Sequence, residues 1–211
     1  MRSEGIVVDV AIVGAGAAGL ATAIFAARRM PGRAIVALDG AKKLGAKILV
    51  AGGGRCNVTN ERVTAGDFCG GSRNTIKQVL AALPVSRTVE FFRELGVTMH
   101  VEEHGKLFPD SNSAKTVLAA LIAEAERRGV RLLAGHRVTG ITRCDEHFEL
   151  STPRGPIAAR AVVLATGGRS LPKTGSDGGG YALAQSLGHT LVPTTPGLAP
   201  LVLDGDFHAP I

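Results

Sequence analysis

The sequence predicts an α/β fold built around a mostly parallel sheet. Three observations predict it: a β-branched apolar run at 6–13, a glycine-rich turn at 14–19 that leads into an apolar helix, and a second apolar run at 34–39. Strand, helix and strand in this order form a βαβ unit with parallel strands. Such strands are buried on both faces, which explains why these two runs are continuously apolar and do not alternate.

The helix of this unit is expected over 20–29, where the sequence reads LATAIFAARR, and it ends before Pro31 and Gly32. From 74 to 129 the pattern becomes helical, and we expect helices at 74–83, 86–95 and 111–129. The last of these is the strongest prediction, because its apolar residues recur at helical spacing and Gly129 stops it. Its buried face should carry Val117, Leu118, Leu121, Ile122 and Ala125.

The remaining elements are expected to be strands. The segment 97–109 reads as a small hairpin that turns at His104 and Gly105. Three further strands at 130–141, 147–155 and 156–168 indicate a β-meander that follows the helical segment. The apolar stretch 161–166, AVVLAT, is typical of another buried central strand.

Composition limits the classes of protein. A chain of 211 residues with 45% hydrophobic and 20% charged residues is long enough for a globular domain with its own core. Its 3 cysteines form no C-x-x-C pair, which favours a reducing cytoplasm over a disulfide framework. The apolar run 7–27 is neither a signal peptide nor a membrane span, because Asp9 interrupts it and glycines cluster at its middle.

The end of the chain has a different character. Residues 190–211 contain four prolines and lack a clear closing helix or strand pattern. We therefore expect a nucleotide-binding domain over 1–192, and a linker or the start of an inserted second domain over 193–211. The expectation is that the chain is the front part of a longer protein.

The glycines of the first turn have the spacing G-x-G-x-x-G, in the sequence GAGAAG at 14–19. In a Rossmann βαβ unit, the first glycine allows the tight turn, the second lets backbone approach a pyrophosphate, and the third lets helix and strand pack closely. The helix N-terminus then offers unpaired N–H groups to the phosphates. The turn, Gly14, Gly16, Ala17, Ala18 and Gly19, is therefore a candidate dinucleotide site.

Asp39 ends the second strand at the distance expected for an acid that accepts hydrogen bonds from a ribose diol. The alternative is that its carboxylate caps the next turn. A second glycine-rich stretch, AGGGRCNVTN at 51–60, follows soon after, and a third, LATGG at 164–168, ends an apolar strand. Although 51–54 also fits a plain turn, two such sites beyond the first turn favour FAD over a nicotinamide dinucleotide.

Three segments, DVAIVGAGAAGLATA, KLGAKILVAGGGRCNVTN and VVLATGGRSLPKTGSDGGGYALAQSLGH, resemble the BaiN/RdsA family of NAD(P)/FAD-dependent oxidoreductases. The resemblance covers nearly the whole chain, and G-G-G-R-C-N-x-T-N is the family's signature. It implies an FAD domain of the glutathione-reductase type, with NAD(P)H as the electron donor. It also implies a C-terminal segment that completes the flavin pocket, and no matching segment follows in this sequence.

The resemblance also implies residue roles. Gly14, Gly16, Gly19 and Asp39 would hold the ADP half of FAD, and Val138 would meet the adenine through its backbone. The pyrophosphate and flavin side would be formed by Lys47, Gly53, Gly54, Arg55, Cys56 and Asn57. Ala165, Thr166 and Gly167 would close over the cofactor. This chain departs from the pattern by having Asp39 in place of the usual Glu and Leu171 in place of the usual aromatic residue.

Other chemistry is disfavoured. Cys56 lacks the nearby second cysteine that a disulfide reductase needs, so a structural or flavin-neighbouring cysteine is the better interpretation. The histidines show no metal-ligand spacing such as H-E-x-x-H, and no metal is expected. No catalytic residue is assigned. A plain NAD-dependent dehydrogenase would leave the second glycine stretch unexplained.

The leading hypothesis is a flavin-dependent reductase that uses NAD(P)H to reduce a carbon–carbon double bond. The resemblance implies two substrate classes, a steroid enone of the bile-acid type and a uridine of ribosomal RNA. Of these two classes the net charge of +6 favours RNA, with Arg28, Arg29, Lys42 and Lys43 as phosphate contacts or as ordinary surface charge. No DNA or membrane partner is expected. The alternative is a non-catalytic FAD- or RNA-binding fragment. The oligomeric state is left open.

Overall fold

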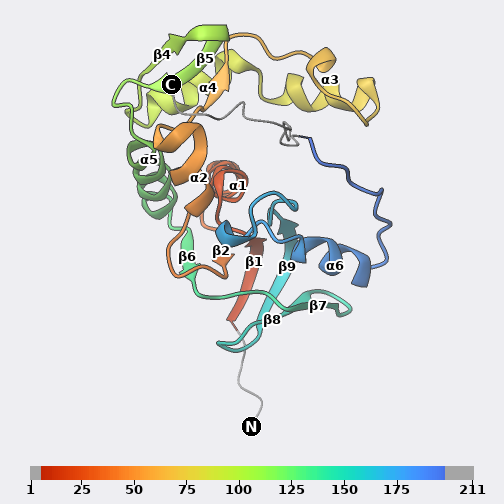
Figure 1. Ribbon diagram of the computed structural model, residues 1–211. Coiled ribbons are helices and arrows are strands. Elements are labelled where there is room, and N and C mark those ends of the chain that lie inside the picture. Colours follow the sequence, from red (N-terminus) through yellow and green to blue (C-terminus); the bar gives the residue numbers. More distant parts are fainter. Residues whose placement is uncertain (1–5, 198–211) are drawn as a thin grey trace, which may run out of the picture.

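The computed structural model describes residues 6–197 of the chain. A six-stranded sheet of order β6-β2-β1-β9-β8-β7 lies at its centre, and a three-stranded sheet of order β3-β5-β4 lies apart from it (Figure 1). The larger sheet contains β1 (Ile6–Val13), β2 (Ile35–Asp39), β6 (Arg131–Ala134), β7 (Gly140–Arg143), β8 (Phe148–Ser151) and β9 (Ile157–Leu164). The smaller sheet contains β3 (Thr59–Asn60), β4 (Met99–Glu102) and β5 (Lys106–Pro109).

The larger sheet is mixed. Strand β1 pairs in parallel with β2 on one side and β9 on the other, and β2 pairs in parallel with β6. Strands β9, β8 and β7 then pair antiparallel as a meander. The predicted fold class, a parallel central sheet with a helical segment and a β-meander, is thereby confirmed. One consequence is that the carboxyl ends of β6, β2, β1 and β9 meet at a single edge.

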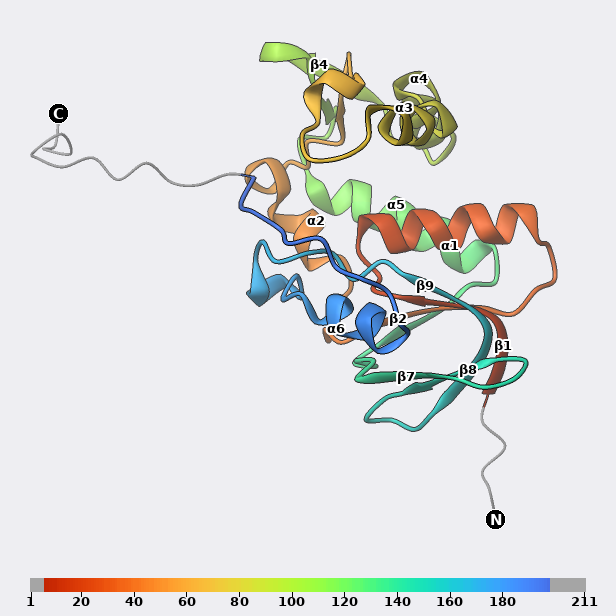
Figure 2. The same cartoon turned by 90° about the vertical axis from the view of Figure 1, so that its right-hand side faces the viewer.

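Two layers cover this sheet (Figure 2). The helices of the chain are α1 (Ala17–Arg29), α2 (Ala46–Val50), α3 (Arg73–Ala82), α4 (Val85–Glu94), α5 (Ala114–Arg127) and α6 (Gly179–Ser186). Helices α1 and α5 cover one face, with Ile12, Leu20 and Ile24 at the centre of that core. On the other face, β7, β8 and α6 pack with β1 and β2 in a second core around Leu38 and Leu150. Burying each of these side chains stabilises the fold by about 1.5–3 kcal/mol.

Helix α5 shows why the helical prediction succeeds. Of the face expected from its apolar spacing, Val117, Leu118, Leu121 and Ala125 are buried and Ile122 is partly buried. The helix ends where Gly129 takes a φ of +76°, a conformation that glycine adopts without steric cost. Periodicity and a glycine stop therefore locate this element to within a few residues.

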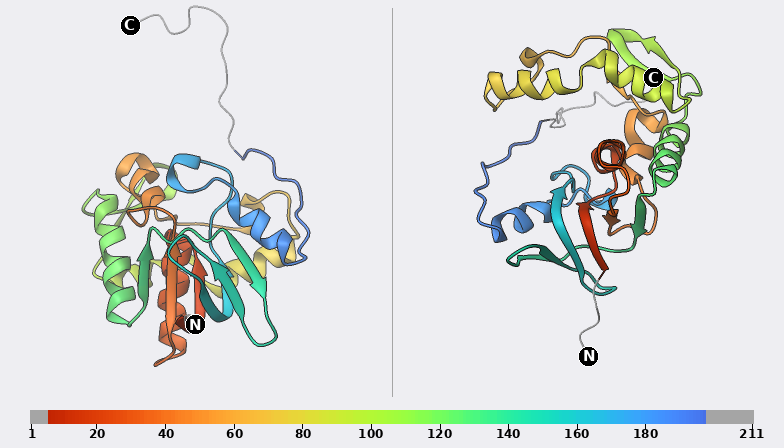
Figure 3. Two further views of the ribbon diagram at one scale, coloured as in Figure 1. Left: turned by 90° about the horizontal axis from the view of Figure 1, so that it is seen from below. Right: turned by 180° about the vertical axis from the view of Figure 1, so that it is seen from behind.

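A side layer lies at the end of the molecule opposite the start of β1 (Figures 1 and 3). It consists of α3, α4 and the three-stranded sheet, in which the predicted hairpin of β4 and β5 is confirmed. Strand β3 adds to β5 through Thr59 and Asn60. Helix α3 has no buried residue. Neither α2 nor α6 was predicted, because each is short and lies inside a glycine-rich stretch.

Strand β9 differs from its prediction as a buried central strand. It lies in the middle of the sheet, but Ala161 is exposed and Val163 is 36% exposed. These side chains point to the same face as Val10 and Ile12, their partners on β1. Since α1 packs against β1 and β2 on that face, it leaves this half of β9 partly open.

Candidate functional site

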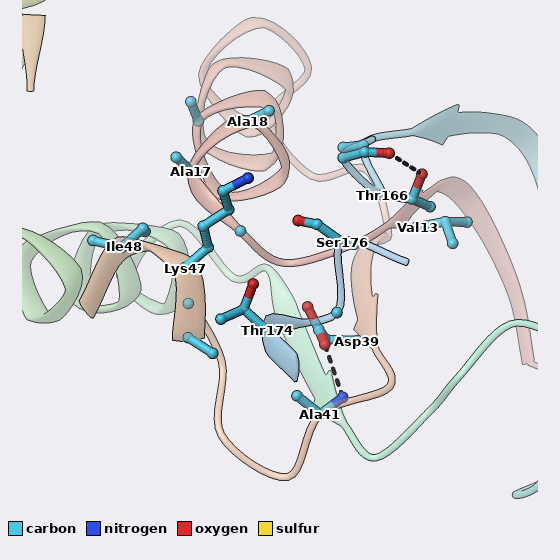
Figure 4. Close-up of a pocket in the computed structure, with 18 of the residues that line it drawn as sticks. Val13, Ala17, Ala18, Asp39, Ala41, Lys47, Ile48, Thr166, Thr174 and Ser176 are labelled. Carbon is cyan, nitrogen blue, oxygen red and sulfur yellow. Dashed lines mark hydrogen bonds between the residues drawn. The ribbon is translucent and has the colours of Figure 1, made fainter. Parts of the chain in front are cut away.

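A cavity of about 970 Å³ lies at the edge where the parallel strands end (Figure 4). Its walls include Val13, Asp39 and Leu164, the last residues of β1, β2 and β9. Ligand sites in open parallel sheets occupy this position, outside the carboxyl ends of the strands. The volume lies at the upper end of the range for small-molecule and cofactor sites, about 300–1,000 Å³.

The first glycine turn forms the floor of the cavity. Gly14 has a φ of +101°, and a Cβ atom added to it would lie 2.5 Å from the carbonyl oxygen of Ala165. A Cβ on Gly19 would lie 1.8 Å from the carbonyl oxygen of Gly14. By contrast, a Cβ on Gly16 would meet no atom within 4 Å. Two glycines are therefore required by packing, and Gly16 keeps the space beside the turn open.

The N-terminus of α1 opens into this space. Gly16 is the N-cap residue, no side chain caps the helix, and its first turn carries no acidic residue. Ala17 and Ala18 line the cavity with Gly16. The unpaired N–H groups and the positive end of the helix dipole make this position suited to a phosphate group.

Asp39 reaches the turn from the end of β2. One carboxylate oxygen accepts a hydrogen bond from the N–H of Ala15 at 2.9 Å, and the other accepts one from the N–H of Ala41 at 2.8 Å. Each oxygen retains a second lone pair, and the residue lines the cavity. The two interpretations of Asp39 are thus compatible, because the same carboxylate holds the turns and remains available to a hydroxyl donor.

The end of β9 forms the wall opposite Asp39. Ala165 donates from its N–H to the carbonyl oxygen of Val13 at 2.8 Å, which extends the β1–β9 pairing one residue beyond the end of β9. Thr166 packs against α6 so closely that a Cβ on Gly180 would lie 1.9 Å from its Oγ1. Ala165, Thr166 and Gly167 all line the cavity.

The third wall comes from α2 and the segment after it. Lys47 and Ile48 of α2 line the cavity, and Lys47 donates from Nζ to Ser170 Oγ. Cys56 and Asn57 also line it, and Cys56 has a φ of +65° that few non-glycine residues adopt. Burial raises the pKa of the Cys56 thiol. It is therefore a protonated thiol at neutral pH, which does not fit a reactive redox cysteine.

Four expected residues lie outside the cavity lining: Gly19, Gly53, Gly54 and Arg55. Arg55 points the other way, into a second cavity of about 490 Å³ beside β4 and β5. There its guanidinium stacks on Phe108, 4.2 Å from the ring centroid, and pairs with Glu102 at 2.5 Å. The expected approach of Arg55 to the flavin edge thus differs from the structure, in which a local anion and an aromatic ring hold the side chain.

Several cavity residues carry no expectation from the sequence. Arg137 lines the cavity next to Val138, the residue expected at the adenine. Thr174, Ser176 and Asp177 line it from the connection between β9 and α6, and Figure 4 shows Thr174 and Ser176 near Asp39. The run Ser-Asp-Gly-Gly-Gly at 176–180, just before an apolar helix, was the signal that could have identified this wall.

Away from this wall the cavity becomes apolar. It continues beside α1 and beneath α4, where Phe25, Phe91 and Phe92 line it. Phe25 and Phe91 stack with their ring centroids 5.0 Å apart. The site therefore combines a polar end with backbone N–H donors and an apolar, aromatic end.

Arg28, one of the expected phosphate contacts, is engaged elsewhere. Its guanidinium pairs with Glu94 at 2.8 Å and with Glu124 at 3.1 Å, so it ties α1 to α4 and α5. Glu124 also pairs with Arg127 and Arg128 and is 7% exposed. These arginines hold the pKa of Glu124 below its usual value although burial opposes the shift. Arg28 thus has a structural role.

Two further properties concern residues 6–197. In that part of the chain, no three histidine, cysteine or acidic residues lie close enough together to hold a metal ion. Of the helices described, none has the length and apolar character needed to cross a membrane.

Comparison with known proteins gives consistent results. A family model described as the HI0933-like protein Rossmann domain matches residues 8–199. The chain is 37% identical over 192 residues to the 3-dehydro-bile acid delta(4,6)-reductase of Clostridium scindens, covering 91% of this chain and 47% of that protein. It is 33% identical over 195 residues to the ribosomal RNA dihydrouridine synthase of Escherichia coli, covering 92% and 48%. The chain therefore spans about half the length of these curated relatives.

Among solved structures, the fold is similar to that of 3-ketosteroid-delta4-(5alpha)-dehydrogenase from Rhodococcus jostii. The TM-score is 0.56 at 20% identity, over 89% of this chain and 55% of that one. At this level of identity the similarity concerns the fold alone.

Proposed function

Because this chain belongs to the HI0933-like Rossmann-domain family, we propose that it is the FAD-binding part of a flavin-dependent oxidoreductase. Its membership confirms the resemblance to the BaiN/RdsA flavoproteins. The observation that carries the proposal is the glycine turn. Gly14 and Gly19 have no room for a side chain, whereas the space at Gly16 is open and faces the uncapped N-terminus of α1. This pattern fits a pyrophosphate held by backbone.

The donor set also fits a dinucleotide. The ADP half would be held by Gly14, Gly16, Ala17, Ala18 and Asp39, with Gly19 packing the helix against the turn. Val138 would meet the adenine, and Lys47, Cys56 and Asn57 would lie along the pyrophosphate and flavin side. Ala165, Thr166 and Gly167 would close the wall beside Gly14. We assign this role to residues 1–192, and the expected linker at 193–211 lies mostly outside the described residues.

When bound, FAD would supply two-electron chemistry that no protein side chain provides. We propose NAD(P)H as the electron donor and an electron-poor carbon–carbon double bond as the acceptor. The names of the two relatives give two acceptor classes, a bile acid and a ribosomal RNA. The apolar, aromatic end of the cavity favours a flat apolar acceptor, whereas the net charge of +6 favours RNA.

Absorption spectroscopy of the purified chain tests the proposal. The chain should show the visible bands of bound flavin when FAD is added, and Gly16→Leu should abolish them. Gly16 has an extended backbone and a free Cβ position, so leucine fills the cavity without disturbing the fold. Gly197→Leu is the matched control, because its Cβ position is also free and it does not line the cavity.

The proposal predicts bound flavin in the wild type and in Gly197→Leu, and none in Gly16→Leu. A wild-type chain that takes up no FAD would contradict it. So would a Gly16→Leu variant that binds FAD as the wild type does. Once binding is established, anaerobic bleaching of the flavin by NADH or NADPH tests the proposed donor.

A further inference from the structure

Residues 168–178 connect β9 to α6 and form one wall of the cavity, and we call them the connecting loop. Five of them, Gly168 and Thr174 to Asp177, line the cavity. The two ends of the loop are joined to each other, because Arg169 and Asp177 form an antiparallel bridge. The N–H of Ser170 also donates to the carbonyl oxygen of Ser176 at 3.3 Å. The connecting loop is therefore closed on itself by backbone contacts.

Two side-chain contacts tie this loop to the rest of the cavity. The first joins Lys47 Nζ on α2 to Ser170 Oγ. The second joins Arg137 Nη2, from the connection between β6 and β7, to Asp177 Oδ2 at 2.7 Å. Both contacts join the loop to segments far away in the sequence.

Arg137 is held at its base as well as at its tip. A Cβ atom on Gly40 would lie 3.0 Å from Arg137 Cβ, so the stem of the side chain packs on the residue that follows Asp39. At the other end, a Cβ on Gly179 would lie 2.9 Å from Arg137 Nη2. The Arg137 side chain therefore connects the end of β2, where Asp39 lies, to the start of α6.

The Asp177 carboxylate is oriented by a backbone contact so that one oxygen accepts from this guanidinium. Its Oδ1 accepts a hydrogen bond from the N–H of Gly179 at 3.0 Å, which leaves Oδ2 for Arg137. These two contacts, first the Gly179 N–H and then Arg137, hold the pKa of Asp177 below its usual value. Asp177 is therefore an anion at neutral pH.

The strength of the pair suits a contact that opens and closes. Arg137 is 50% exposed and Asp177 is 35% exposed. Ion pairs with this degree of exposure change an equilibrium by about 1.4- to 5-fold. Such a contact shifts the equilibrium between two positions of a loop, but the stability of the fold does not depend on it.

We propose that Arg137 and Asp177 form an ionic clamp that holds the connecting loop closed against the adenosine end of the cavity, and that opening of this clamp limits how fast a bound dinucleotide leaves. The clamp rests on the proposed function in one respect, because the dinucleotide is taken to be FAD. Arg137 is a positioning residue in this scheme. It acts through the loop and needs no contact with the reacting atoms.

The rate of FAD dissociation from three variants tests the clamp. Arg137→Met keeps the stem that packs on Gly40 and removes the charge, whereas Asp177→Asn keeps an acceptor for Gly179 and removes the charge. The third variant combines both changes. Arg160→Met is the control, since Arg160 is 63% exposed, pairs with Asp9 at 3.0 Å and does not line the cavity.

After rapid dilution of the FAD complex, the return of free flavin fluorescence gives the dissociation rate. Each single variant should release FAD about 1.4- to 5-fold faster than the wild type. The double variant should be no faster than either single variant, because both remove the same interaction. Added salt should speed release from the wild type more than from the variants, and Arg160→Met should behave as the wild type.

Unchanged release from both single variants would overturn the clamp and leave the proposed function intact. Absence of FAD binding in the wild type would instead remove the proposed function. Amide hydrogen exchange in the protein without FAD then tests the clamp separately. Faster exchange within 169–178 in Arg137→Met, but not in Arg160→Met, supports it, and equal exchange in the two variants overturns it.

Discussion

Two glycine-rich turns border the candidate site, and their glycines are required for different reasons. At Gly14 and Gly19 there is no space, because a Cβ would overlap backbone atoms at 2.5 Å and 1.8 Å. At Gly52 to Gly54 the backbone conformation is the common requirement, with φ angles of +55°, +66° and +86°. At Gly53, a Cβ would meet nothing within 4 Å. The first turn depends on close packing, with Gly14 also at a φ of +101°, whereas the second depends mainly on left-handed backbone.

Gly19→Ala should have the largest effect. Its new methyl group would lie 1.8 Å from the carbonyl oxygen of Gly14, and neither backbone segment can move aside cheaply. We expect a loss of about 3 kcal/mol or more in the free energy of unfolding, measured by urea denaturation. Gly16→Ala is the control and should stay within about 1 kcal/mol of the wild type, because its Cβ position is free. Equal losses at both positions would contradict the packing argument.

Gly52→Ala and Gly53→Ala should separate the two causes within the second turn. Both place alanine at a positive φ, which costs about 1–2 kcal/mol. Gly52→Ala should cost about 1 kcal/mol more, because its Cβ would also lie 2.7 Å from the backbone nitrogen of Asn57. Gly53→Asn is the control and should recover part of the loss, since asparagine tolerates left-handed backbone. Identical stabilities for the two alanine variants would show that space is irrelevant in this turn.

Asp39→Asn tests what holds the first turn in place. The carboxylate accepts from two N–H groups, of Ala15 and Ala41, whereas an amide offers only one acceptor oxygen. One N–H loses its partner, so we expect a loss of about 1–2 kcal/mol in the free energy of unfolding without FAD. Asp145→Asn, at a turn between β7 and β8, is the control and should have little effect. An unchanged stability of Asp39→Asn would mean that Asp39 serves a ligand alone.

The same comparison explains how much of the fold and of the candidate site can be predicted from the sequence. Local patterns predicted the βαβ unit, the hairpin and α5, because periodicity and glycine stops act over a few residues. They also predicted which residues follow β1, β2 and β9, and therefore most of the cavity. They could not predict the direction of Arg55, which depends on Phe108 and Glu102 from another sheet. Nor could they pair Arg137 with Asp177, 40 positions away along the chain.

The partial exposure of one face of β9 could not be predicted from the sequence, for a related reason. An apolar run such as 161–166 looks the same whether a helix covers it or not, and here α1 packs over β1 and β2 instead. The left-handed conformation of Cys56 is equally invisible, because that residue type rarely adopts it. In each case the missing information lies in contacts between distant segments.

Arg55→Met should have the smallest effect on the cavity and is the sharpest test of the difference between the turns. The Arg55 guanidinium holds the pKa of Glu102 below its usual value, so the variant should raise that pKa, as followed by NMR titration of the carboxyl group. A lowered carboxyl pKa stabilises the folded state above the ordinary Glu value, and this contribution is lost as the pH falls through the folded-state pKa. The stability difference between wild type and variant should therefore be constant above the ordinary Glu value and shrink as the pH falls below it.

The affinity of Arg55→Met for FAD should change less than about twofold, because the side chain does not line the cavity and screening weakens its charge at a distance. Lys106→Met, which alters the same second cavity without touching the glycine turn, is the matched control. A tenfold loss of affinity in Arg55→Met alone would mean that the arginine turns toward the cofactor when it binds. The second turn would then act on the ligand through a side chain, whereas the first acts through backbone alone.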